Sequence, residues 1–86
     1  MKYLIETVED TANKMMYISS VYSSKSDREQ EELRALFKKH TNTLMRVIEV
    51  IEIQGIEIPQ CYKWRMSVAM AMIELSIKQM EGKWNT

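Results

Sequence analysis

Few residues of this chain have the types and spacing that an active site requires. His40 is the only histidine and Cys61 the only cysteine among the 86 residues. A nucleophile and its base also need an orienting acid and an oxyanion-binding loop, and no such pattern accompanies this pair. A lone histidine on an apolar helical stripe is more often a packing residue than a catalytic one. We therefore expect a protein that is not an enzyme.

Metal and cofactor chemistry has equally little support. One cysteine and one histidine do not complete the four ligands of a closed zinc site. The chain has only two glycines, and they form no glycine-rich phosphate loop. We expect no metal and no cofactor.

Cations beside aromatic residues are the remaining chemical signal. A lysine charge, an arginine fork and an aromatic face are the parts that recognise a small anion carrying a base. They occur at Tyr22, in Phe37-Lys38-Lys39 and in Lys63-Trp64-Arg65. Simpler interpretations stay open: Lys38 and Lys39 suit a solvated helix face, and Trp64 suits a core position.

The charge balance limits which anion these residues could bind. Twelve basic side chains cancel twelve acidic ones, whereas a protein that wraps duplex DNA usually carries a basic excess. We expect no duplex DNA partner. A small anionic ligand needs only two or three placed cations and remains compatible with this composition.

Three features together resemble a known family. A tyrosine, Tyr22, precedes a capped helix, and a lysine, Lys38, follows sixteen residues later. A third helix then opens with Trp64 and Arg65 and continues rich in methionine and alanine. From Tyr22 to Met80 the chain resembles the phage anti-CBASS sponges, small helical-hairpin proteins that sequester cyclic oligonucleotide second messengers.

The resemblance implies a function and roles for individual residues. It implies a hexameric phage protein in the host cytoplasm that captures cyclic di- and trinucleotides, such as cyclic GMP–AMP, and so blocks CBASS antiviral signalling. Tyr22 would stack on a base of the dinucleotide, while Lys38, or its neighbour Lys39, would meet a phosphate. Arg65 would serve a separate cyclic-trinucleotide pocket. The alternative is a protein-interaction module, a phage regulator that lays its Met-rich face on a host protein.

Helix signals divide the chain into three segments. The first helix is expected at about 4–19, followed by a serine-rich loop whose Val21 and Tyr22 could also continue it. Ser26 and Glu29 form a capping box that begins a second helix at about 26–54. Gly55 ends that helix, and the extended connector before Pro59 leads to a third helix at about 60–82. The alternating stretch 51–58 also fits a strand, but no second strand is available to pair with it.

These segments predict an all-α single domain spanning 1–86. Two long helices joined by a short connector must lie antiparallel, and the shorter N-terminal helix is expected to pack across this hairpin. After Lys2 the N-terminus offers only three apolar residues before acidic ones interrupt, and no apolar run approaches a membrane span. With a single cysteine, these features indicate a cytoplasmic protein without a membrane partner.

The third helix is apolar on two sides, which is more than one partner helix covers. One stripe comprises Trp64, Val68, Ala71 or Met72, and Leu75. The other comprises Met66, Met70, Ile73, Ile77, Met80 and Trp84, with Ala69 beside it. Because so short a chain cannot hide both stripes, we expect a homo-oligomer. We expect the second stripe to pack between subunits and to bring Arg65 and the lysines of neighbouring chains around one ligand.

Overall fold

Three helices make up the described part of the chain. The computed structural model describes residues 1–84, and of Trp84 only the backbone. Helix α1 spans Lys2–Val21, α2 spans Asp27–Ile53 and α3 spans Gln60–Trp84, with a short 3₁₀ turn, η1, at Tyr22–Ser24. Within residues 1–84 no strand is present, so the all-α prediction and the rejection of a strand at 51–58 are confirmed.

Local capping explains both ends of α2. The Ser26 hydroxyl accepts a hydrogen bond from the Glu29 backbone N–H, and the Glu29 carboxylate accepts one from the Ser26 N–H, which completes the predicted capping box. At the other end Gly55 adopts a left-handed conformation with φ of 61°. The N–H of Ile56 donates to the Ile51 carbonyl and that of Gly55 to the Glu52 carbonyl, as in a Schellman motif.

The serine-rich segment corrects one expectation. Helix α1 continues through Ser19 and Ser20 to Val21, and the following turn is 3₁₀ rather than an open loop. The hydroxyls of Ser19, Ser20 and Ser24 each donate to the carbonyl three residues earlier. These hydrogen bonds are compatible with a helical backbone, so the serines do not end the helix.

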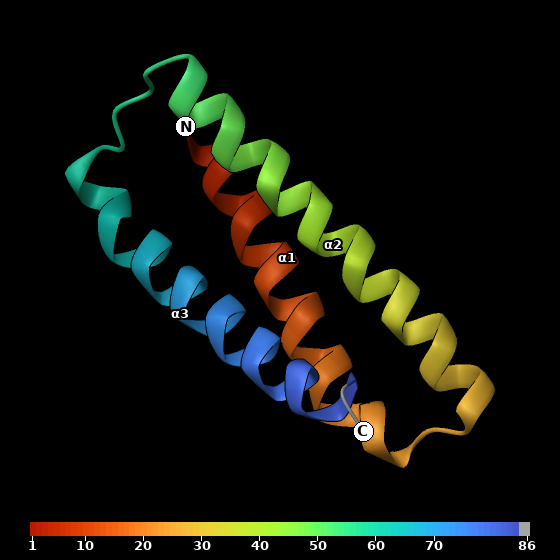
Figure 1. The fold of residues 1–86 in the computed structure, drawn as a ribbon. Coiled ribbons are helices and arrows are strands. Elements are labelled where there is room, and N and C mark those ends of the chain that lie inside the picture. Colours follow the sequence, from red (N-terminus) through yellow and green to blue (C-terminus); the bar gives the residue numbers. More distant parts are fainter. Residues whose placement is uncertain (85–86) are drawn as a thin grey trace.

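The arrangement of the helices also differs from the expected one. Figure 1 shows α1 between α2 and α3, running in the same direction as α3 and opposite to α2. The hairpin of α2 and α3 is therefore antiparallel, but α1 packs against both of its arms instead of crossing over it. With twenty residues, α1 is long enough to run beside most of α3.

The core forms where α1 meets the other two helices. Small side chains, Ala12 and Ser19 on α1 and Ala69 and Ser76 on α3, are buried in this region and permit a close approach of the helix backbones. The larger members of the core are Val8, Met15, Ile18, Tyr22, Phe37, Leu44, Ile73 and Met80.

The two apolar stripes of α3 differ in burial. Ile73 and Met80 are 1% and 0% exposed, and Met66, Met70 and Ile77 pack partly buried against the same core. The expectation that this stripe lies between subunits is therefore wrong, because α1 covers it within the chain; the side chain of Trp84 lies outside the described part. Trp64, Val68 and Leu75 of the other stripe are exposed, whereas Met72 packs partly against the core, so one chain does not hide both stripes completely.

Candidate functional site

Arg65, in the second turn of α3, forms an ion pair with Glu9 of α1. Arg65 Nε donates to Glu9 Oε2 at 3.0 Å and Nη2 donates to Oε1 at 2.5 Å. Both side chains are about one-third exposed. The hydrogen bonds from Arg65 lower the pKa of the Glu9 carboxyl against the opposing effect of desolvation, and those to Glu9 raise the pKa of Arg65. Both groups are therefore charged near neutral pH.

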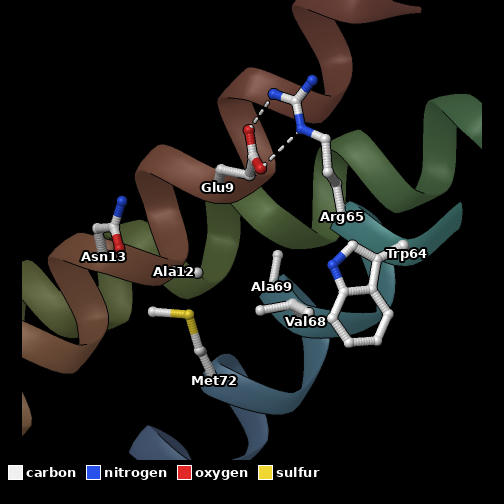
Figure 2. Close-up of a pocket in the computed structure, with 8 residues that line it drawn as sticks. All are labelled: Glu9, Ala12, Asn13, Trp64, Arg65, Val68, Ala69 and Met72. Carbon is white, nitrogen blue, oxygen red and sulfur yellow. Dashed lines mark hydrogen bonds and ion pairs between the residues drawn. The ribbon is translucent and has the colours of Figure 1, made fainter. Parts of the chain in front are cut away.

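The ion pair lies at the rim of a groove between α1 and α3. The groove has a volume of about 400 Å³, within the range of small-molecule sites. Figure 2 shows the Trp64 indole along one side and the Arg65–Glu9 pair above it. The lining residues are Glu9, Ala12, Asn13, Trp64, Arg65, Val68, Ala69 and Met72. Trp64 is 77% exposed, so the alternative interpretation of Trp64 as a core residue is wrong.

Part of the Arg65 guanidinium remains available to an anion. Glu9 engages Nε and Nη2, and Figure 2 shows the remaining nitrogen directed away from the carboxylate. The Tyr62 ring flanks the group, with 5.5 Å between Arg65 Cζ and the ring centroid. Glu9 and Tyr62 thus hold an arginine whose outer edge can donate to a phosphate, although Glu9 cancels most of its charge locally.

Tyr22 lies in the core and not at a surface site. It is 3% exposed; its hydroxyl accepts a hydrogen bond from Arg34 Nη1 at 2.8 Å, and its carbonyl accepts one from Gln30. The Lys83 ammonium lies 5.9 Å from the ring centroid and donates to the Ser19 carbonyl. The expectation of an open loop tyrosine is wrong, since packing against α2 and α3 leaves no ring face open to a base.

The structure does not gather the four predicted site residues. Tyr22 follows α1, whereas Arg65 meets α1 at Glu9, about 20 Å earlier along the helix. Lys38 and Lys39 are exposed on α2 and do not line the groove of Arg65. Because Tyr22 is buried, no ligand at the surface of one chain contacts all four.

A second groove lies between α1 and α2. Its volume is about 480 Å³, and its lining comprises Asn13, Lys14, Tyr17, Ile18, Leu36 and His40. Desolvation, then the charges of Lys14 and Lys39, lower the pKa of His40, while Asp10 opposes them. The His40 side chain is half-buried and lines this groove. Cys61 lines neither groove.

Sequence reasoning missed the partners of Arg65. Glu9 is fifty-six residues away and belongs to an ordinary charged face of α1, so no local pattern marks it. Tyr62, three residues before Arg65, had a detectable signal, because residues at that spacing share a helix face. Tyr17 on α1 is 62% exposed and lines the second groove. No role was assigned to it from the sequence.

Other kinds of site find no support in the described residues. No group of three potential ligands for a metal ion occurs in residues 1–84. Over the same range, none of the helices has the length and apolarity needed to cross a membrane. Comparisons of this chain with protein families, with curated proteins and with solved structures found no match.

Proposed function

We propose that this chain is a non-catalytic phage protein that sequesters cyclic oligonucleotide immune signals in the host cytoplasm and so blocks CBASS signalling. The observation that carries the proposal is the groove in which a positioned Arg65 lies beside the exposed ring of Trp64. An arginine edge suits a phosphate and an indole face suits a base.

The size of the groove favours a site shared between copies. About 400 Å³ is at the small end of ligand pockets, so a cyclic di- or trinucleotide would extend beyond one chain. Glu9 also offsets the charge of Arg65, and further cations are needed to hold two or three phosphates. In the proposed homo-oligomer, a hexamer by the family resemblance, Lys38 or Lys39 of a neighbouring copy supplies them.

The proposal changes the roles of two predicted residues, Tyr22 and Arg65. Base stacking passes from Tyr22, which is buried, to Trp64, and Tyr22 becomes a structural residue. Arg65, which the resemblance assigns to a separate cyclic-trinucleotide pocket, contacts a phosphate in this proposal.

Native mass spectrometry with cyclic GMP–AMP and a cyclic trinucleotide tests the proposal. We expect a homo-oligomer that gains a fixed number of ligands and loses them in Arg65→Gln and in Trp64→Ala. Each base stack is worth about 1–3 kcal/mol, so Trp64→Ala should weaken binding by at least fivefold. Lys2→Gln, remote in sequence and exposed, is the matched control. Unchanged mass with every ligand, or full binding by both variants, contradicts the proposal.

A protein-interaction module is the second candidate, and a specific observation favours it. Large apolar side chains are exposed on all three helices; they include Tyr3, Tyr17, Leu36, Met45, Ile53, Trp64 and Leu75. Such patches commonly mark binding surfaces. The exposed face is not the Met-rich one, because Met66, Met70 and Met80 face the core. A monomer in light scattering that binds no cyclic oligonucleotide would favour this candidate.

A further inference from the structure

The second groove, between α1 and α2, has no role in the proposed function. Its volume of about 480 Å³ is within the range of small-molecule sites. Its apolar surface comes from Ile18, Leu36 and the ring of Tyr17, which are 2%, 41% and 62% exposed. A ligand in this groove would therefore cover leucine and tyrosine surface that is now in contact with water, and the burial of that surface favours binding.

Three polar side chains of the second groove form no hydrogen bond within residues 1–84. They are the amide of Asn13, the hydroxyl of Tyr17 and the imidazole of His40. Desolvation and neighbouring charges lower the pKa of His40, so its ring is neutral near pH 7 and offers one donor and one acceptor. The Asn13 amide also carries both, side by side. These groups can bind a ligand that has no charge.

The charges at the second groove give little preference for an ion. Lys14 belongs to the lining and pairs with Asp10 at 2.8 Å. Lys39 lies beside His40 but is exposed and outside the lining, where a single cation contributes little. A smaller adjoining groove shares Leu36, and its surroundings contain charges of both signs, those of Lys25, Arg28, Glu29 and Glu32.

We propose that the second groove binds an uncharged aromatic heterocycle that carries a hydrogen-bond donor beside an acceptor on one edge. Its ring packs against Tyr17 and Leu36. Its edge pairs with the Asn13 amide, as asparagine pairs with the donor–acceptor edge of adenine, and His40 provides a further donor or acceptor. Of the lining residues, Asn13 alone is shared with the groove of Trp64, so the inference does not rest on the proposed function.

7-Azaindole is a suitable probe, because it is uncharged and carries a ring N–H beside an acceptor nitrogen. The chain has one histidine, so the NMR signals of its imidazole report on the groove directly. They should shift in a saturable way, with a Kd on the order of 1 mM. Indole lacks the acceptor nitrogen and should bind about three- to tenfold more weakly, since one neutral hydrogen bond is lost. Equal binding of indole, or tighter binding of the anion naphthalene-2-sulfonate, overturns the proposal.

Variants place the bound probe in one groove or the other. Leu36→Ala and Tyr17→Ala remove lining surface, and each should weaken 7-azaindole binding about fivefold. Leu75→Ala and Tyr3→Ala make the same changes at residues that are 48% and 78% exposed outside the groove, and they should leave binding unaltered. Trp64→Ala should also leave it unaltered, because Trp64 lines the first groove. Circular dichroism verifies that each variant is folded. Full binding by Leu36→Ala and Tyr17→Ala, or loss of binding in Trp64→Ala, contradicts the assignment to the second groove.

Discussion

Arg65 fastens the beginning of α3 to the middle of α1 through two hydrogen bonds to the Glu9 carboxylate. Among the ion pairs identified in the described chain, the other three join residues four apart on one helix, whereas this one spans fifty-six residues. Because α1 and α3 are parallel neighbours (Figure 1), the pair fixes their relative level, and with it the groove beside Trp64.

Removing the carboxylate of Glu9 should make the protein less dependent on pH. The pKa of Glu9 is lowered in the folded chain, so its contribution to stability is present above the unfolded value of about 4.5 and is lost as the pH falls through the folded value. Glu9→Gln should lower the free energy of unfolding near neutral pH and flatten its fall in acid. Urea denaturation over that range measures both effects.

The control for Glu9 is Asp10→Asn. Asp10 pairs with Lys14 at 2.8 Å on the exposed side of α1, and such pairs contribute little. An equal loss of stability and acid dependence in both variants would contradict a special role for the Arg65–Glu9 pair.

Tyr22 should behave as a core residue in mutagenesis. Tyr22→Ala removes a buried ring and should cost about 3–5 kcal/mol of unfolding free energy. Tyr22→Phe keeps the ring and loses only the bond from Arg34, which is worth about 0.5–1.5 kcal/mol. Tyr17→Ala, on the exposed side of α1, should cost about 0.5 kcal/mol or less. Chemical denaturation compares the three.

Ligand binding by Tyr22→Leu separates structure from function. If Tyr22 stacked on a base, as the resemblance implies, Tyr22→Leu would lose cyclic oligonucleotide affinity while remaining folded. We expect its affinity to be unchanged, as measured by calorimetry at a temperature well below unfolding.

His40 should make the protein less stable as the pH falls below neutrality. Desolvation and the charges of Lys14 and Lys39 lower its pKa in the folded chain, so the unfolded chain takes up the proton first, near pH 6.5. Stability should therefore decrease as the pH falls through about 6.5 and level off once the folded chain is also protonated. Since His40 is the only histidine, His40→Gln should abolish this step in thermal melts; a step that survives would have another origin.

The ends of the helices could be predicted because their signals are local. Ser26 and Glu29 satisfy each other's backbone groups within one turn, and Gly55 supplies a conformation that other residues avoid. Such signals act within a few residues, so they need no knowledge of the partner helix. The prediction of a loop at the serine-rich segment was wrong because a serine hydroxyl can form its hydrogen bond either in a turn or, within a helix, with the carbonyl three residues earlier. The packing of Tyr22 in the core favours the helical form.

The site itself depends on which helix covers which face. The sequence shows that α3 has two apolar stripes, but their patterns do not tell which one meets α1. The small residues Ala69 and Ser76 decide it, because they allow the backbone of α1 to come close on the side of Ile73. Once that side is buried, Trp64 must be exposed, and Arg65 at the boundary reaches Glu9. The exposure of Trp64 and the contact between Arg65 and Glu9 cannot be predicted until the packing of α1 against α3 is known.

Neighbouring positions on α3 offer a final test of this division. Ile73 is 1% exposed, and Leu75, two residues on, is 48% exposed. Ile73→Ala should cost about 2–5 kcal/mol of unfolding free energy and leave a cavity. Leu75→Ala should cost about 0.5 kcal/mol or less in dilute monomer. Chemical denaturation of dilute protein measures the difference; equal stability losses would mean that α3 is rotated from its observed orientation.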